Sequence, residues 1–498
     1  MSTIFTLPTL SAALSILPSS LPFIAKAPAA KPTQPANKFV AAAESIAASS
    51  MGDKYPILST SPLSSKETAA LAAELDAIRD EVMADLGEQD ALYIRRVYAT
   101  VAYSEIAGRL LLVAAALPKS KRARLGLWLA GVTSLSLSKI LNNMELGHNV
   151  MHGQYDWLQD NHLNSRQFDW DNMCPAPLWQ HSHNYLHHTF TNIVGRDHDV
   201  GYHLVRITDE QPWQPHDRFN LLKIAFLAMG FEWAVAFHDV QISFQEYKQS
   251  DEFPTIMRQK SRSLLAKIVR QVGKDYVALP LATGLIGGKR SVAYTLTGNI
   301  TANIARNIWT WAVIFCGHFT EQAHIYTHLD DNETRGDWYV RQMLGSSNIT
   351  GSKLFHIMTG NLSHQIEHHL FPDLPANRYA SIAPKVAAVC KKYNLSYNTG
   401  PFSTQLSQVI RRIHYFSQQT AAEKLASQQA KINKVADEPA ISNAVFNDEL
   451  TFTAESASKE SATESATGYK SGFRFVSAQR KRFIKKLPPI LAQTLAYI

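Results

Sequence analysis

The chain has 498 residues, 45% of them hydrophobic, and a formal net charge of +7. Its three cysteines lie far apart and form no Cys-x-x-Cys pair, which excludes a disulfide framework and a thiolate metal site. The basic residues are scattered among apolar segments and form no stripe. The charge therefore indicates a membrane surface or another anionic partner and argues against nucleic acid.

Polar, low-complexity segments flank the apolar middle of the chain. Residues 1–62 are rich in Ala, Ser and Pro and lack a positive region ahead of their apolar stretch, so we predict a disordered segment and not a secretory signal. In residues 63–96, Ser64 and Glu67 form a capping box, and apolar residues at helical spacing predict an amphipathic helix. Residues 416–498 are predicted to be a low-complexity tail with a basic C-terminus.

Four apolar segments are candidates for membrane crossings, because each is close to the length that crosses a hydrocarbon core of about 30 Å. They are 98–117, 125–141, 276–288 and 292–317. The last two meet at Gly287-Gly288, which indicates a turn. Histidine clusters that share one metal site must lie on the same side of the membrane, so the number of crossings between them must be even. A fifth apolar run, 219–237, is therefore predicted to lie on or dip into the membrane and not to cross it.

The basic residues give conflicting signals for orientation. The linker 242–275 is basic and favours the cytoplasm, but the loop 119–124 is basic too and the same arrangement places it outside. We give the basic linker the greater weight in setting the orientation. We predict an all-α integral-membrane bundle of about four crossings over residues 97–415. A helical cap at its cytoplasmic face would carry three histidine clusters.

These clusters lie close to the ends of the apolar segments. Their members are His148 and His152 (cluster one), His183, His187 and His188 (cluster two), and His368 and His369 (cluster three). Imidazole is the usual nitrogen ligand of iron, copper, nickel and zinc, so the clusters can hold two metal ions without a carboxylate.

Cluster three lies in NLSHQIEHHLFPDLPAN (361–377). Residues three and four positions apart share a helix face, so Gln365 or His364 can point where His368 points. His369 lies about 100° further round the helix and can serve a second metal ion. Two prolines then end the helix, because proline donates no backbone hydrogen bond.

The chain resembles the integral-membrane fatty-acid desaturases in three motifs. These are GHNVMH (147–152), HNYLHHTFTN (183–192) and HQIEHHLFPDLP (364–375). The likeness extends over roughly residues 90–405 and is greatest to the bacterial, mycobacterial-type stearoyl-CoA 9-desaturases. The Gln-x-x-His-His pattern of the third motif is also similar to that of front-end desaturases.

The resemblance implies two iron ions as cofactor, O2 as co-substrate, and a cis double bond, at position 9, in a long-chain acyl-CoA or acyl-lipid. It also implies a multi-pass protein of the bacterial inner membrane whose active site faces the cytoplasm. No His-Pro-Gly-Gly motif occurs, so no fused cytochrome b5 or haem is expected. Electrons would then come from a separate protein of the ferredoxin or flavin-reductase type.

The ligands that the resemblance implies are His148, His152, His183, His187, His188, His368, His369 and, in the CGHF sequence, His318. Gln365 stands where many family members have histidine, so His364 is the alternative ligand there. No catalytic residue beyond the ligands is implied.

Polar residues next to the clusters can orient the histidines by accepting a hydrogen bond from the second ring nitrogen. The candidates are Glu145, Asn149, Asn192, Asp197, Asp199 and Glu367. For each of them an ordinary capping or surface role is an equal alternative. Trp157, Trp170 and Trp179 could line an acyl tunnel, but the favoured prediction is that they anchor the chain at the membrane interface. His238 is predicted to be structural.

Three other functions fit parts of the pattern. A front-end, 6-type desaturase would share the third motif, and a membrane di-iron hydroxylase of fatty acids or alkanes would share the histidine clusters. A membrane metal carrier would bind ions at the histidines without turnover, but it needs polar ligands within several spans. The desaturase-like QIEHHLFPDLP sequence favours desaturation.

Overall fold

The computed structural model describes residues 55, 57–58, 61–328, 332–420, 423–425 and 427–428. This part is mostly helical, in agreement with the all-α prediction. Two short parallel sheets pair β1 (Ile57–Leu58) with β2 (Ile325–Tyr326) and β3 (Asn348–Thr350) with β4 (Thr399–Pro401). The predicted tail, 416–498, lies mostly outside the described residues, as does the segment 1–62, of which Ile57 and Leu58 are described as a strand.

Helix α2 (Ser65–Ala84) begins at the predicted capping box. The Ser64 hydroxyl accepts from the Glu67 backbone N–H, and the Glu67 carboxylate accepts from the Ser64 backbone N–H. Leu71 and Leu75 are fully buried in a core shared with α12 (Arg335–Leu344), α14 (Gln365–Leu370) and α15 (Tyr379–Lys392). This amphipathic helix therefore packs on the elements that carry and surround cluster three.

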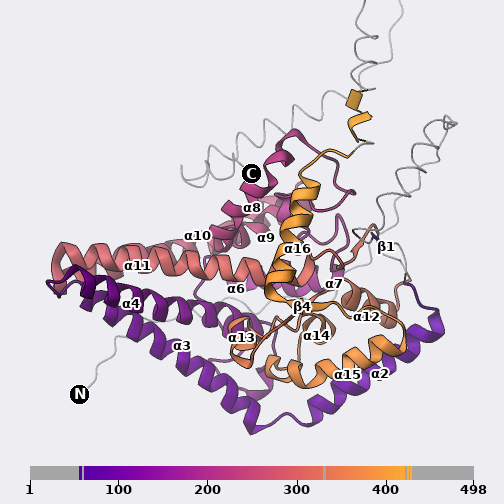
Figure 1. Ribbon diagram of the computed structural model, residues 1–498, viewed down its shortest axis with the longest axis horizontal. Helices are drawn as coiled ribbons and strands as arrows, with labels where there is room; N and C mark the ends of the chain where they lie inside the picture. Colours follow the sequence, from indigo (N-terminus) through magenta and orange to yellow (C-terminus); the bar gives the residue numbers. More distant parts are fainter. Residues whose placement is uncertain are drawn as a thin grey trace, which may run out of the picture. The chain divides into compact units, whose positions relative to one another are not determined.

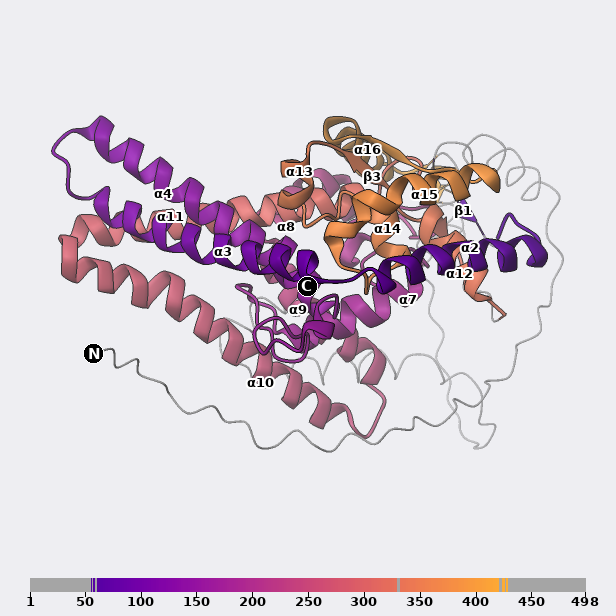
Figure 2. The ribbon, with the colours of Figure 1, turned by 90° about the horizontal axis from the view of Figure 1, so that it is seen from below.

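Helices α3 (Glu88–Ala114) and α4 (Lys121–Leu141) form the first hairpin. Small residues let them approach closely: a Cβ on Gly108 would lie 2.8 Å from the Leu135 backbone nitrogen and 3.0 Å from the Gly131 carbonyl oxygen. The pair corresponds to the predicted crossings 98–117 and 125–141. Helices α3, α4 and α11 (Leu279–His318) contact one another and lie side by side (Figures 1 and 2).

The second hairpin turns at Gly288, where glycine is suited to the observed φ of 68°. Helix α10 (Phe253–Val272) continues through the π-helical segment Gly273–Ala278 into the first part of α11, and the chain then reverses (Figure 2). A Cβ on Gly287 would lie 3.6 Å from the Ala116 Cβ, so the tips of the two hairpins meet. The Gly-Gly sequence thus predicted the turn correctly.

The predicted run 219–237 is bent. Helices α8 (Asn220–Met229) and α9 (Phe231–Tyr247) meet at Gly230, and the pair Pro215–Met229 and Phe231–Tyr247 is bent by 99°. Among the described helices, only Glu88–Ala114 is by itself long and apolar enough to cross a membrane, and the bent pair can supply a second crossing. The length and apolar content of the helices therefore do not establish the predicted four crossings, which stay a prediction.

Buried ion pairs connect the hairpins to the loop before cluster two. The Lys139 ammonium lies 2.7 Å from Asp171 and 2.8 Å from Asp275, and Arg306 lies 2.5 Å from Glu232. Such pairs persist only when each buried charge has a partner. They also place charged side chains on α4 and α11, which lowers the apolar content of these two helices.

Short elements complete the described fold. They are the π-helices Asn142–His148 (η1) and Gln180–His187 (η3), the helices α5 (Asn149–Met151), α6 (Ala176–Trp179), α7 (His188–Phe190), α13 (Lys353–Met358) and α16 (Phe402–Phe416), and the 3-10 turns Asp156–Leu158, Gly201–His203, Pro215–Phe219 and Ala376–Arg378.

Gly108→Ala is expected to lower the free energy of unfolding by about 1–3 kcal/mol, because the added methyl group has no room between α3 and α4. Gly126→Ala on α4 is the matched control, since a Cβ there meets nothing within 4 Å and alanine favours a helix. Thermal unfolding of the purified chain in detergent would test this. Equal melting temperatures for the two variants would contradict the close approach of the helices.

Candidate metal centre

Four separate segments of the chain bring the histidines together. In cluster one, His148 ends η1 and His152 directly follows α5, while cluster two lies on η3 and α7. Cluster three lies on α14, and His318 is the last residue of α11. Clusters one and two fall in π-helical turns, a local geometry that is frequent at functional sites. The helical spacing expected for cluster three is observed, since Gln365–Leu370 is an α-helix.

The nitrogen atoms converge in two groups. His148, His152, His183 and His368 form the first group, and His187, His318 and His369 form the second. Within each group all the ligand atoms lie within 4.8 Å of one another. The two closest contacts join Nε2 atoms, at 3.2 Å between His148 and His183 and 3.0 Å between His318 and His369. Two ions could thus bind side by side.

His188 lies between the two groups. Its ring centroid is 4.7 Å from that of His152 in the first group and 4.4 Å from that of His369 in the second. Both of its ring nitrogens are buried, and neither has a hydrogen-bond partner among the described residues. The structure thus brings together all eight histidines that were predicted as ligands.

The residues present fit a metal centre. Among the predicted ligands, further buried nitrogens without a hydrogen-bond partner in the described part of the chain are Nε2 of His152, Nε2 of His368 and Nδ1 of His318. Leaving such atoms buried and unpaired is costly, and a bound cation would satisfy them. Burial and the neighbouring imidazoles hold the pKa values of His152, His188 and His368 well below 6.5, so these rings are neutral, as metal ligands must be.

Carboxylates of the loop after cluster two orient its histidines. The Asp197 carboxylate lies 3.0 Å from His187 Nδ1, while Asp199 lies 3.6 Å from His187 Nδ1 and 3.8 Å from His183 Nδ1. Burial alone would lower the pKa of His187, but the Asp197 carboxylate raises it overall. Both aspartates therefore face ring nitrogens, as predicted for residues that orient ligands. Asp199 also forms a group with these two histidines that is compact enough to hold an ion itself.

Three orienting contacts were not predicted. Gln342 Oε1 lies 2.9 Å from His369 Nδ1, and the Tyr379 hydroxyl lies 3.2 Å from His368 Nδ1. His238 Nε2 lies 2.8 Å from Asp199, so this histidine reaches the centre through a carboxylate. These residues lie outside the histidine motifs, and no local pattern in the sequence indicates them.

The remaining polar candidates have different positions. Asn149 Oδ1 lies 3.3 Å from His148 Nδ1 and can orient that ring. Asn192 does not contact a ring: it adopts a φ of 58° and donates through its side chain to the carbonyl groups of His324 and Gly345. Its own backbone N–H donates to Asp197, so Asn192 shapes the loop that carries this aspartate.

The two glutamates lie behind the histidine-bearing turns. Glu145 accepts from the Tyr93 hydroxyl at 2.6 Å and from the Asn361 amide at 2.9 Å. Glu367 accepts from the Asn348 amide and the Tyr397 hydroxyl. Burial raises the pKa of Glu145 to about 8 and also raises that of Glu367. Both tie the histidine-bearing turns to neighbouring elements.

Gln365, and not His364, lies beside the metal groups. Its Nε2 is 2.9 Å from His318 Nε2, and a side chain on Gly317 would clash with it. The His364 ring instead packs on His356, with centroids 4.6 Å apart. The alternative ligand considered from the sequence is therefore in the wrong place.

A cavity of about 40 Å³ reaches the first metal group. His148 and His183 line one part of it, and Trp170, Trp179 and Val235 are among its other lining residues. Trp170 and Trp179 are buried, and the Trp179 ring stacks on His183 at 4.5 Å. The prediction that these two tryptophans anchor the chain at a membrane interface is therefore wrong, because they are packed inside the protein next to the histidines.

The family model for fatty acid desaturases matches residues 126–401. The chain belongs to the fatty acid desaturase family. It is therefore a desaturase, an oxidoreductase of lipid metabolism, and members of this family are generally membrane-associated.

Named relatives agree with this assignment. The chain is 45% identical over 346 residues to the NADPH-dependent stearoyl-CoA 9-desaturase of Mycobacterium tuberculosis. This alignment covers 69% of this chain and 78% of the relative. It is 27% identical to the sn-1 linoleoyl-lipid 6-desaturase of Synechocystis sp., over 55% of this chain and 76% of the relative. The protein of the same name from Arthrospira platensis is 26% identical, over 54% and 73%. No solved structure gives a significant match.

Gln342→Leu is expected to weaken metal binding about 10- to 100-fold, because it removes the acceptor that orients the His369 ring. Gln342→Glu keeps an acceptor at that position and should retain most of the affinity. Gln405→Leu is the control, since the Gln405 side chain is buried and donates to the Asn348 carbonyl group instead. Iron bound per chain, measured during titration of the metal-free protein, tests this. Equal affinity of the wild type and Gln342→Leu would exclude an orienting role.

Glu145→Gln is expected to flatten the dependence of stability on pH. The pKa of Glu145 is about 8 in the folded chain and 4.5 ordinarily, so folding favours the protonated form. The stability of the fold that depends on protonated Glu145 is fully present below the ordinary pKa of a glutamate. It is lost as the pH rises through the pKa of Glu145 in the folded chain. Melting temperatures from about pH 5 to about pH 8 should fall more steeply for the wild type. Parallel curves would mean that Glu145 does not titrate in this range.

Proposed function

We propose that the chain inserts a cis double bond at position 9 of a long-chain acyl-CoA, using O2 and a pair of histidine-bound iron ions. The observation that supports this most directly is the convergence of two groups of buried imidazoles, the first of which borders an internal cavity. The name of the relative from M. tuberculosis supports the position of the double bond and the acyl-CoA substrate.

The ligand assignment follows from the two groups. His148, His152, His183 and His368 would hold one iron ion, and His187, His318 and His369 would hold the other, with His188 next to both. Imidazole nitrogen is a suitable ligand for iron, and every proposed ligand is an imidazole. Bound iron supplies the reduction of O2 to water, for which the acyl chain gives two hydrogens and an external donor gives two electrons with two protons.

The protein's own side chains would position the substrate. Part of the acyl chain would pass Trp170, Trp179 and Val235, which line the cavity of about 40 Å³ next to His148 and His183. This volume is smaller than a long acyl chain needs, so the remainder of the chain would lie outside the cavity. Asp197, Gln342 and Tyr379 would hold the ligand rings in place throughout.

The setting in the cell follows the same proposal. The chain would be a multi-pass protein of the bacterial inner membrane, with α3, α4 and the two arms of the Gly288 hairpin as its crossings and the metal centre facing the cytoplasm. Exposed apolar side chains support lipid contact on these helices, including Ile106 and Leu110 on α3, Leu129 on α4, and Leu281, Leu285 and Ile286 on α11. Electrons would come from NADPH through a separate electron-transfer protein, as the name of the M. tuberculosis relative suggests.

His368→Ala is expected to abolish desaturation, because it removes a ligand of the first group. His364→Ala is the matched control: this histidine lies on the same segment but packs on His356, and the variant should retain most of the activity. The measurement is gas chromatography, with localisation of the double bond, of fatty acids from cells that express each variant. A new 9-monoene that only His368→Ala loses is the expected result.

Other products would decide among the alternatives. A double bond at position 6 would assign the chain to the front-end type, and a hydroxy acid would make it a hydroxylase. Unchanged fatty acids in the presence of a competent electron donor would favour a metal-binding carrier.

A further inference from the structure

Three residues near the start of the described chain contact the segments that surround the second metal group. The Tyr55 side chain is 4% exposed, and its ring centroid lies 5.0 Å from that of Tyr415 and 5.1 Å from that of Phe416. Ile57 and Leu58 form β1, which pairs in parallel with β2. We call Tyr55, Ile57 and Leu58 the N-terminal strap. All three precede residues 126–401, which the family model matches.

Strand β2 connects the strap to the loop that orients His187. Tyr326 pairs in parallel with Leu58 on one side and with Ile193 on the other. The N–H of Asp197 donates to the carbonyl oxygen of Ile193 at 2.8 Å, and the Asp197 carboxylate lies 3.0 Å from His187 Nδ1. Three backbone segments therefore lie side by side, and the innermost carries the carboxylate that faces a metal ligand.

The Tyr55 ring also covers a buried arginine on α16. The guanidinium carbon of Arg412 lies 5.2 Å from the centroid of this ring, within the range of a cation–π contact. Arg412 is fully buried and donates to the carbonyl oxygens of Thr320 and Ala323 at 2.8 and 3.1 Å. Because Thr320 comes two residues after His318, Arg412 holds the turn that follows this ligand.

The third histidine of the group is connected to β2 through α12. The N–H of His324, directly before β2, donates to the carbonyl oxygen of Leu344 at the end of α12 at 2.9 Å. Gln342 on the same helix contacts His369 Nδ1 at 2.9 Å. Each histidine of the second group is thus supported by a segment that contacts either β2 or Arg412, the two partners of the strap.

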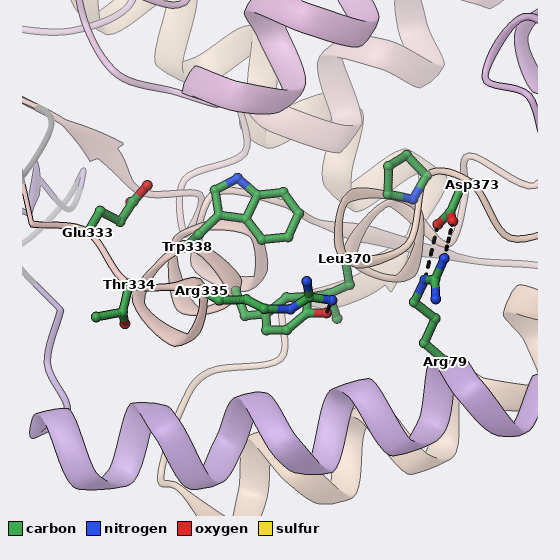
Figure 3. A pocket seen from close by; sticks show the side chains of 9 residues that line it. Arg79, Glu333, Thr334, Arg335, Trp338, Leu370 and Asp373 are labelled. Carbon is green, nitrogen blue, oxygen red and sulfur yellow. Dashed lines mark hydrogen bonds and ion pairs between the residues drawn. The ribbon is translucent and has the colours of Figure 1, made fainter.

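Helix α2 fixes the chain that follows the strap to the same side of the centre. Arg79 extends from α2 toward Asp373, with which it pairs, in the segment after α14 (Figure 3). Arg335 at the start of α12 lies 2.6 Å from Asp76 on α2. Leu58 is close in the chain to the start of α2, so the fixed helix lowers the entropic cost of holding the strap against β2.

The first metal group has supports on other elements. The Tyr379 hydroxyl on α15 lies 3.2 Å from His368 Nδ1, and Asn149 Oδ1 on α5 lies 3.3 Å from His148 Nδ1. Neither of these elements is part of the contacts through β2 and Arg412. Loss of the strap is therefore expected to act on the two groups unequally.

We propose that the N-terminal strap is a positioning element for the second metal group, and that it holds His187, His318 and His369 ready for their ion without acting on the first group. The inference rests on the proposed function, which places an ion in each group. Contacts behind metal ligands change metal affinity about 10- to 100-fold, because they fix the orientation of the rings. The strap acts through one further layer of contacts, so we expect an effect at the lower end of this range.

The test is a titration of the metal-free, full-length protein in lipid nanodiscs with Co²⁺, whose visible absorption reports its ligands. The wild type should bind two ions. In Tyr55→Ala the second ion should bind about tenfold more weakly, because the ring over Arg412 is lost. Tyr55→Phe keeps the ring and should restore binding. Phe402→Ala is the matched control: Phe402 lies at the other end of α16, with its ring centroid 5.8 Å from those of Trp309 and Phe355, and its loss should leave both ions bound.

Double variants show which ion is weakened. His152→Ala in the Tyr55→Ala background removes a ligand of the first group and should abolish the remaining tight binding. His318→Ala in the same background should leave the single tight ion unchanged, because its group is already weakened. Tyr55→Leu keeps an apolar side chain at this position without the aromatic face. It should weaken the second ion in the same direction, and it decides the question if Tyr55→Ala does not fold.

Other results overturn the proposal. They are unchanged affinity for the second ion in Tyr55→Ala and Tyr55→Leu, equal weakening of both ions, or an effect of Phe402→Ala as large as that of Tyr55→Ala. A wild type that binds fewer than two ions would also overturn it. If the ions behave as expected but the wild type forms no double bond with a competent electron donor, the positioning role stands and the proposed desaturation fails.

Discussion

The burial of eight imidazoles around two small volumes is the constraint on which the rest of this structure depends. Buried ring nitrogens without hydrogen-bond partners are costly, so the fold must supply either partners or a cation. It does so with residues from distant segments: Asp197 after cluster two, Gln342 on α12 and Tyr379 on α15. The segments around the histidines therefore hold the orientations of the rings.

The helical hairpins have a complementary role. Their tips meet at Ala116 and Gly287, while the opposite end of α11 delivers His318 to the second metal group. The charged network around Lys139 and Arg306 lies between these ends. Lys139 lies on α4, and among the described helices α3 by itself meets the criterion of length and apolar content whereas α4 does not.

The internal cavity reaches only the first metal group. His148 and His183 line it, together with Trp170, Trp179 and Val235 and with polar side chains such as Asn143 and Asp199. None of the histidines of the second group, His187, His318 and His369, is among the residues that line this cavity. The two groups therefore differ in their access to the cavity.

The sequence by itself determined the histidine clusters, the helical class, the capping box at Ser64 and the turn at Gly288, because each depends on residues that are close together in the chain. Only the tertiary structure decided that Gln365 and not His364 faces the metal groups, that Trp170 and Trp179 are internal, and that Gln342, Tyr379 and His238 complete the centre. The physical reason is that orientation at a buried site is set by packing between distant segments. Local periodicity carries no information about such contacts, and the π-helical turns depart from it.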